Sequence, residues 1–170
     1  SAVIWLYNSN NSRIYNSSFV SSYLAIRLDT MRLTNIENVS INNSGFSGVS
    51  VGTSRNLLVR NAFINNATTA LDLINIYNST ITGVKTFLMS HAGISFNIGD
   101  DNLVDNSTLN QSGSYAFYCG GGNRNKFMNV SFHNASVGVF SYYTCINLNV
   151  TDSKFESTDT GVTLTPNGNS

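Results

Sequence analysis

The residues of this chain that could most directly do chemistry are two adjacent aspartates, Asp100 and Asp101. A pair of carboxyl groups can act as acid and base on a glycosidic bond. Two further aspartates, Asp72 and Asp29, are too sparse to supply the six or more oxygens that a calcium site needs. We expect Asp72 to be a solvated surface residue. One short segment is therefore the candidate for catalysis.

The histidines and cysteines predict no metal site and no cofactor. His91 and His133 are the only histidines, and they fall at different offsets of the repeat described below. Cys119 is expected at an inward strand position and Cys145 at a turn. Three interpretations stay open for this pair: an internal disulfide, an intermolecular disulfide through Cys145, or two free thiols.

Several aromatic residues are expected on the surface of the predicted strands. They are Trp5, Tyr118, Phe140 and either Tyr142 or Tyr143. Exposed rings can stack against sugars, and they can also form contacts to a neighbouring subunit. Of these two interpretations, we favour the subunit contact.

Every one of these residues belongs to a repeat with a period of 22 or 23 residues. The small residues that open each unit are Ala2, Ala25, Gly48, Ala70, Gly93, Ala116, Gly138 and Gly161. One place later the residue is always apolar, and the residue after that varies freely. This period-two alternation predicts eight short strands that each bury one face. In the first unit it places Val3 and Trp5 inward, which conflicts with the surface position expected above for Trp5 among the aromatic residues.

A second column of the repeat consists mainly of asparagine. It comprises Asn16, Asn38, Asn61, Gly83, Asn106, Asn129 and Asp152. Stacked amides can donate and accept hydrogen bonds along an axis, and asparagine tolerates the left-handed backbone of sharp corners. We therefore predict an internal asparagine ladder in which Gly83 replaces one member. Asp101 falls in a further column of corner residues, which favours a turn role over catalysis.

The period and the strand pattern predict an all-β fold, a parallel β-helix or β-solenoid. About seven and a half coils of 22–23 residues fit the 170 residues, which we assign to one domain, residues 1–170, with no capping helix. A leucine-rich repeat has a similar period, but it needs leucines at fixed spacing and usually a helix in each repeat. Neither feature is present.

Composition excludes some partners. The net charge is zero and 11% of residues are charged, so no basic patch is available for nucleic acid. No run of 18 apolar residues occurs, so no membrane span is predicted in this sequence.

Eleven Asn-X-Ser/Thr sequons occur in the sequence and support an extracellular, cell-surface location. Those expected at turns, which could carry glycan, are Asn10, Asn42, Asn66, Asn110 and Asn134. Those within the predicted internal ladder, which could not, are Asn16, Asn38, Asn106 and Asn129.

The sequence starts at Ser1 within a predicted strand. We expect either a mature chain after removal of a signal peptide or a piece of a longer solenoid. A solenoid without caps would offer unpaired backbone groups at both ends. We expect such ends to join subunits head to tail, as a ring or a filament.

Gly99-Asp100-Asp101 resembles the Gly-Asp-Asp element of polygalacturonase-type β-helix hydrolases. The resemblance covers three residues only. The Asn-Thr-Asp element expected one coil earlier is absent, since residues 77–80 read YNST, and no Gly-His-Gly or Arg-X-Lys follows. We therefore predict no catalytic site and expect that the protein is not an enzyme.

Over its whole length the chain resembles the parallel β-helix repeats of Asn-rich archaeal cell-surface proteins and of NosD-like proteins. The segments that carry this resemblance are IYNSSF, IENVSI, VRNAFI and FMNVSF. It implies a building block of a surface layer or of a methanogen sheath that assembles with copies of itself. The alternative is a β-helix that binds or cleaves carbohydrate, with glycans as partners.

Overall fold

The computed structural model describes residues 2–110, 112–142 and 144–165, and all regular structure within these ranges is β-strand. Tyr143 and Pro166 lie outside the described residues, so the interpretation of Tyr143 as a surface aromatic is left as it stands. The strands are β1 (Ala2–Tyr7), β2 (Arg13–Asp29), β3 (Met31–Arg32), β4 (Asn35–Val51), β5 (Ser54–Arg55), β6 (Leu58–Arg60), β7 (Phe63–Tyr77), β8 (Thr80–Thr82), β9 (Lys85–Asp100), β10 (Leu103–Asn110), β11 (Tyr115–Cys119), β12 (Gly122–Asn123), β13 (Lys126–His133), β14 (Val137–Ser141), β15 (Cys145–Ile146), β16 (Asn149–Thr151), β17 (Lys154–Glu156) and β18 (Thr160–Leu164).

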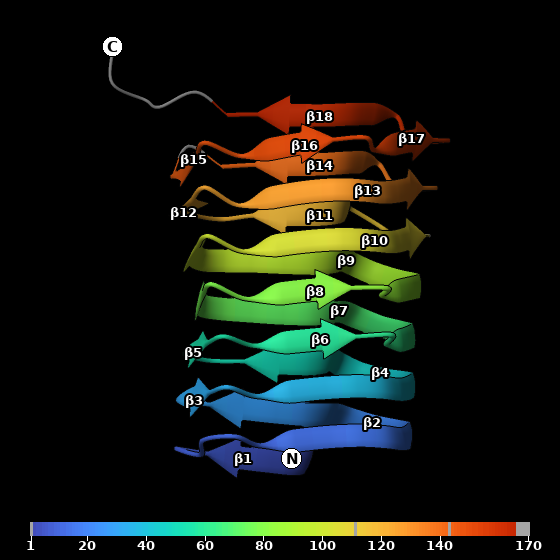
Figure 1. Ribbon diagram of the computed structural model, residues 1–170. Coiled ribbons are helices and arrows are strands. Elements are labelled where there is room, and N and C mark those ends of the chain that lie inside the picture. Colours follow the sequence, from blue (N-terminus) through green and yellow to red (C-terminus); the bar gives the residue numbers. More distant parts are fainter. Residues whose placement is uncertain (1, 111, 143, 166–170) are drawn as a thin grey trace.

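These strands stack as the coils of a parallel β-helix of about seven turns (Figure 1). Each strand pairs in parallel with its equivalent one coil away, as in Ile36↔Val59 and Ile94↔Phe117. The long strands β2, β4, β7 and β9 bend around corners and contribute to more than one face. The predicted all-β solenoid without helices is confirmed for the described residues, and among them no helix could cross a membrane.

Each coil has three faces, which we name A, B and C. Face A is built from β1, β11, β14 and β18 with the later parts of β2, β4, β7 and β9. Face B contains β6, β8 and β16 with the beginnings of β2, β4, β10 and β13. Face C contains β17 with the segments that follow on β2, β4, β7, β9, β10 and β13. A short fourth segment, formed by β3, β5, β12 and β15 with the ends of β7 and β9, links face A to face B.

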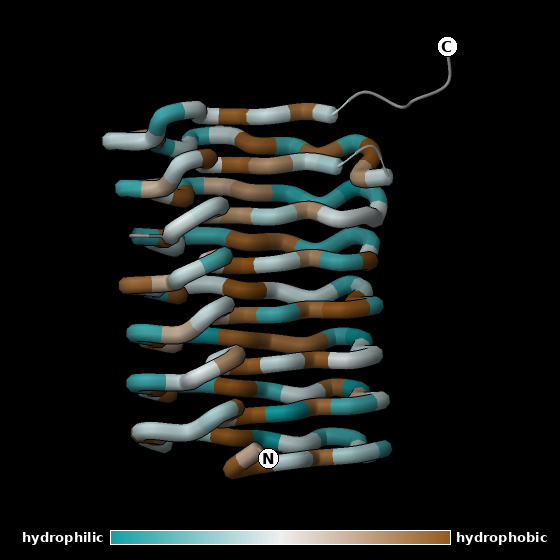
Figure 2. Tube along the Cα trace, turned by 180° about the vertical axis from the view of Figure 1, so that it is seen from behind, coloured by the Kyte–Doolittle hydropathy of each residue, from teal (hydrophilic) through white to brown (hydrophobic). Residues whose placement is uncertain are grey.

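The core is a set of apolar columns that run through the coils. On face A, one column comprises Ile26, Val49, Leu71, Ile94, Phe117 and Val139, and all six are fully buried. Along each strand, apolar inward positions alternate with outward ones, which is visible as alternating colours along the tube in Figure 2. Full burial of one such side chain stabilises the fold by roughly 1.5–3 kcal/mol. Because these side chains recur from coil to coil, this stabilisation is distributed along the coils.

The predicted alignment of the first coil was wrong by one residue. Val3 and Trp5 point outward and are 61% and 63% exposed, whereas Ile4 and Leu6 pack against the core. The pairs are Ile4↔Ile26 and Leu6↔Leu28. The first step is 22 residues, and a slip of one residue in a strand exchanges its two faces.

The corners between the faces are formed by residues in the left-handed conformation. Between faces B and C, φ is between 45° and 64° at Asn16, Asn38, Asn61, Gly83, Asn106, Asn129 and Asp152. The corner before face B repeats the same conformation at Asn11, Leu33, Asn56, Asn78, Asp101, Arg124 and Asn147. A third row, before face A, comprises Ser21, Asn43, Asn66, Leu88, Asn134 and Ser157. The prediction that asparagine accommodates the coil corners is confirmed, because it adopts this backbone with little strain.

The asparagine ladder exists, but it is not internal. Asn38 donates from Nδ2 to Oδ1 of Asn16 at 3.2 Å, and Asn61 donates to Asn38 at 3.1 Å. Asn129 donates to Asn106 at 3.5 Å. The asparagine side chains of this column are exposed, as is Asp152. A corner residue in the left-handed conformation lies where the backbone changes direction, and its side chain points away from the core.

Candidate functional site

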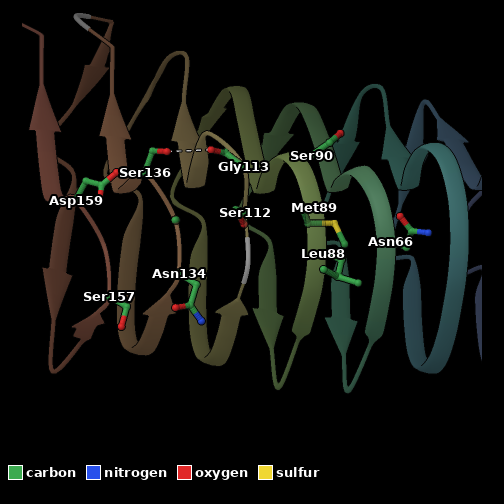
Figure 3. A pocket seen from close by; sticks show the side chains of 11 residues that line it. Asn66, Leu88, Met89, Ser90, Ser112, Gly113, Asn134, Ser136, Ser157 and Asp159 are labelled. Atoms are coloured by element: carbon green, nitrogen blue, oxygen red, sulfur yellow. Dashed lines mark hydrogen bonds between the residues drawn. The ribbon is translucent and has the colours of Figure 1, made fainter.

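Two surfaces of the described molecule could serve as sites. One is an open groove of about 680 Å³ at the corner between faces C and A (Figure 3). It crosses several coils and is lined by Asn66, Leu88, Met89, Ser90, Ser112, Gly113, Asn134, Ala135, Ser136, Ser157 and Asp159. The groove lies where this corner row has Leu88 in place of an asparagine.

The chemistry of the corner groove is limited. Ser136 donates to the carbonyl of Gly113 at 3.0 Å, and the buried hydroxyl of Ser112 has no hydrogen-bond partner. Among its described lining residues Asp159 is the only carboxylate. The described lining of the groove therefore offers mainly hydroxyl, amide and backbone groups for hydrogen bonding.

Asp100 and Asp101, the paired aspartates, are each bonded to a residue of the next coil. The carboxylate of Asp100 accepts from the backbone N–H of Asn123 at 2.8 Å. Asp101 is a corner residue with φ of 57°, and Arg124 donates to both of its carboxylate oxygens at 2.6 Å. This arginine holds the pKa of Asp101 below its ordinary value. The predicted turn role of Asp101 is confirmed.

The second surface is an aromatic cluster on face A, which we name the ring platform. It comprises His91, Tyr115, Tyr118, Phe140 and Tyr142, from β9, β11, β14 and the segment that follows β14. The rings of Tyr118 and Phe140 are nearly parallel, at 4° with centroids 5.7 Å apart, and Tyr115 lies 4.8 Å from Phe140. His91 meets Tyr115 edge-on at 5.5 Å.

Asp72 lies beside the ring platform and is not the solvated residue that the sequence predicts. It is partly buried, and Asn97 donates to its carboxylate at 3.1 Å. Burial raises the pKa of Asp72, and the nearby His91 opposes that rise. Loss of water around the carboxylate favours its neutral form. Asp72, Asn97 and His91 thus place polar groups along one edge of the rings.

Trp5 lies in the same outward column of face A as Tyr118, but five coils away. That separation is about 24 Å at the usual spacing of paired strands. Its indole donates to Asp29 at 2.8 Å, and Arg27 lies over its ring. Trp5 and Asp29 are therefore separate from the ring platform, and the sequence grouped Trp5 with Tyr118 only through their shared exposure.

The second histidine is also separate. His133 lies on face C, where Nδ1 is 2.8 Å from the carboxylate of Glu156. The prediction that the two histidines occupy different columns is confirmed. Among residues 2–110, 112–142 and 144–165, no group of His, Cys, Asp or Glu side chains could hold a metal ion.

Of the three interpretations for the cysteines, the structure has the internal disulfide. Cys119 and Cys145 are bonded, with Cα atoms 6.1 Å apart. The two cysteines are one coil plus three residues apart in the sequence. They come close because Cys145 pairs with Gly122 of the preceding coil, and Gly122 follows Cys119 by three residues. The backbone of Tyr142 is held between the two cysteines, through bonds to the carbonyl of Cys119 and from the N–H of Cys145.

Two buried polar arrangements were missed by the sequence analysis. Glu37 is 3% exposed, and its carboxylate is paired with Arg60 and, at 3.4 Å, with Arg13 from the coils on either side. The hydrogen bond from Arg60 lowers the pKa of Glu37. The sequence did contain a signal for this pairing, because Glu37 and Arg60 have opposite charges and occupy equivalent positions in neighbouring repeats.

The second arrangement is an internal ladder of Asn102 and Asn125, which are 1% and 0% exposed. Asn102 donates to Oδ1 of Asn125 at 3.0 Å, and that same oxygen accepts the backbone N–H of Asn102. Asn125 donates to the carbonyl of Gly99 at 2.8 Å. These two residues lie one place after the corner column, an offset that the repeat alignment had not examined.

The exposed ladder changes which sequons are accessible. Asn10, Asn66 and Asn134 are exposed as expected, and Asn42 and Asn110 are partly exposed. The argument that excluded Asn16, Asn38, Asn106 and Asn129 was wrong, because these side chains are exposed too. Glycosylation at any of these positions stays a prediction.

Comparison with known proteins agrees with this geometry. Residues 24–170 match the family model described as "Right handed beta helix region". No curated protein matches the chain.

Among solved structures, the catalytic unit of the thermostable GH87 α-1,3-glucanase from Streptomyces thermodiastaticus strain HF3-3 superposes with a TM-score of 0.53 at 10% identity. That match covers 92% of this chain and 46% of the glucanase chain, so this chain spans about half of its length. A structure of QnrB1, a plasmid-mediated fluoroquinolone resistance protein, matches at a TM-score of 0.16 and 12% identity, over 87% of this chain and 91% of the other. At 10% identity, the likeness to the glucanase concerns the fold alone.

Proposed function

Because this chain belongs to the right-handed β-helix family, we propose that it is an extracellular structural rod that assembles with copies of itself at the cell surface. A β-helix on its own is compatible with many functions, so the proposal has to rest on what the side chains of this chain do.

The observation that carries the proposal is the use of exposed and partly exposed polar side chains at and beside the corners. They bond from coil to coil along the axis and in this way fix each coil on the next. The bonded pairs are Asn16–Asn38, Asn38–Asn61, Asn42–Asn65, Asn43–Asn66, Asn56–Asn78, Asp101–Arg124, Asn106–Asn129, Asn110–Asn134 and Asn123–Asn147.

Such ladders serve rigidity more than recognition. An amide that bonds to its equivalent in the next coil offers fewer groups to a ligand, while it resists sliding of one coil on another. The low charge of the chain favours close approach of copies, since little repulsion opposes it. Both features suit a building block of an extended surface layer or sheath.

We place the joint between copies at the coil faces. In β18, Val162 and Leu164 occupy the inward columns above Val139 and Ser141, yet they are 45% and 68% exposed. A coil of the same geometry stacked on β18 would cover both side chains and continue the parallel pairing. In the proposed assembly, a second copy supplies that coil.

Electron microscopy of the purified chain at increasing concentration tests this proposal. We expect ordered rods, tubes or sheets, and we expect Leu164→Lys to abolish them because it places a charge in the joint. Thr163→Lys is the matched control, since Thr163 is adjacent on the same strand but points outward. A chain that stays monomeric at every concentration, or assemblies insensitive to Leu164→Lys, would contradict the proposal.

A further inference from the structure

We propose that the ring platform on face A is a binding site for a neutral saccharide. This inference concerns a lateral face of the rod, so it is independent of the proposed joint at the coil ends. It starts from the rings: His91, Tyr115, Tyr118, Phe140 and Tyr142 form one continuous cluster with centroid separations of 4.8–6.5 Å.

The rings are presented outward by a rigid base. Tyr118 and Phe140 are directly paired residues of β11 and β14, so their backbones are fixed by parallel hydrogen bonding. Beneath them, Phe117 and Val139 are fully buried. Tyr142 is 41% exposed, and the Cys119–Cys145 disulfide lies beside its backbone. A preorganised ring surface loses little conformational entropy when a ligand binds.

The polar edge of the platform suits sugar hydroxyls. Asp72 offers acceptor oxygens, one of which is bonded to Asn97, and the amide of Asn97 is partly exposed beside it. His91 and the hydroxyls of Tyr115 and Tyr118 can each donate or accept. A pyranose has apolar C–H groups on its faces and hydroxyls around its rim. Aromatic ring carbons bordered by a carboxylate, an amide and hydroxyls can contact both parts of that molecule.

Charge argues against a nucleic acid as the occupant. A strand of nucleic acid also stacks on aromatic rings, but it requires cationic groups for its phosphates. In the outward column of face A that contains Tyr118 and Phe140, the charged residue nearest to them is Asp72, and Arg27 lies two coils beyond it. A neutral sugar meets no such electrostatic penalty.

A second copy of the chain is the other occupant to consider. A protein interface of useful size would cover the platform and its surroundings together, including the partly buried carboxylate of Asp72. Burying that carboxylate further without a cationic partner is unfavourable, whereas a sugar hydroxyl would donate to it. The polar edge therefore favours a saccharide over the subunit contact that the sequence analysis favoured.

The test uses the whole chain and a defined set of neutral oligosaccharides: hexasaccharides of glucose, xylose, mannose and galactose, first immobilised on an array and then titrated by calorimetry. We expect at least one of them to bind. Tyr118→Ala and Phe140→Ala should each weaken binding about tenfold, because each removes a stacking ring. Asp72→Asn should weaken it less, since the amide keeps one acceptor.

Tyr15→Ala is the matched control, since Tyr15 is 55% exposed on face B and belongs to no part of the platform. It should leave binding unchanged, and circular dichroism should show the same fold for all variants. Binding of none of the oligosaccharides, or equal loss in the control, would overturn the inference. So would sedimentation velocity that shows a dimer dispersed by Tyr118→Ala, because the platform would then be an interface between copies.

Discussion

At the scale of single residues, the backbone conformation of the corners explains most of the unusual composition. A left-handed φ is strained for most side chains and least so for glycine and asparagine. In the corner between faces B and C, asparagine occupies five of the seven positions, with Gly83 and Asp152 at the others. The many asparagines of this chain are therefore first a consequence of backbone geometry and only second a source of hydrogen bonds.

Gly83 allows this account to be tested. Gly83→Asn should keep the fold and leave stability within about 0.5 kcal/mol, because asparagine accepts φ of 64° and can join the ladder between Asn61 and Asn106. A Cβ at this position meets Oδ1 of Asn61 at 2.6 Å, and that side chain can rotate away. Gly83→Val should lower the free energy of unfolding by roughly 1–3 kcal/mol, since a β-branched residue is strained there.

Chemical denaturation of the two variants measures the difference. Equal destabilisation by asparagine and valine would show that lack of space for any side chain, and not backbone conformation, selects glycine at residue 83.

At the scale of elements, the repeat alignment predicted what stacks on what but not which way every side chain points. The column through Ile26 and Leu71 was predicted from period-two alternation alone and is buried. The orientation of the asparagine column was mispredicted because sequence spacing places a residue at a corner without saying which side of the corner it faces. The burial of Asn102 and Asn125 was not predicted, because polar residues were assigned to turns by residue type alone.

The ring platform was only partly predictable. Tyr118 and Phe140 share a column of the repeat, so their contact followed from the alignment. Tyr115, His91 and Tyr142 join them through side chains that reach across columns, and such reach depends on rotamers that a repeat alignment does not contain.

The internal pair Asn102 and Asn125 carries a prediction for strand packing. Asn125→Leu removes the acceptor of the backbone N–H of Asn102 and the donor to the carbonyl of Gly99. Leucine itself fits this column, where Leu57 is buried in another coil. The variant should therefore lose roughly 2–5 kcal/mol through unpaired buried groups and not through a clash.

Thermal unfolding followed by circular dichroism measures this loss, with Asn149→Leu, at an exposed residue of β16, as the control. A similar stability for the Asn125→Leu variant and the original chain would mean that water replaces the lost bonds.

At the scale of the whole molecule, several of the few charged side chains form ion pairs between coils. Arg13, Glu37 and Arg60 join three successive coils, and Asp101 is tied to Arg124 in the next. Hydrogen bonds from the basic side chains lower the pKa values of Glu37 and Asp101. Because these links connect neighbours only, their protonation should loosen the rod coil by coil.

The pH dependence of stability follows from these shifts. A lowered pKa in the folded state gives stability that is present above the unfolded value, about 4.3 for glutamate, and lost as pH falls through the folded value. The melting temperature should thus fall below about pH 4, and Glu37→Gln should reduce that fall by lowering the melting temperature at neutral pH.

Asp72 should act in the opposite sense. Its pKa is raised in the folded chain, so its contribution to stability is present below about pH 3.9 and lost as pH rises through the folded value. Asp72→Asn should therefore raise the melting temperature at pH 7 and leave it unchanged at pH 3. Scanning calorimetry from pH 3 to 8 on both variants checks the two signs. Parallel profiles for Glu37→Gln and Asp72→Asn would refute this account.

The corners also fix the perimeter of a coil at 22 or 23 residues, and every pairing in the rod depends on that perimeter. An inserted residue would shift the register of all later rows, but an inserted set of residues equal to one turn, such as a second copy of residues 58–79, would keep each row in register. Gene segments of this size can therefore be duplicated or deleted like links of a chain, so that the rod can be lengthened or shortened in steps of about 4.8 Å without any new design of its interior.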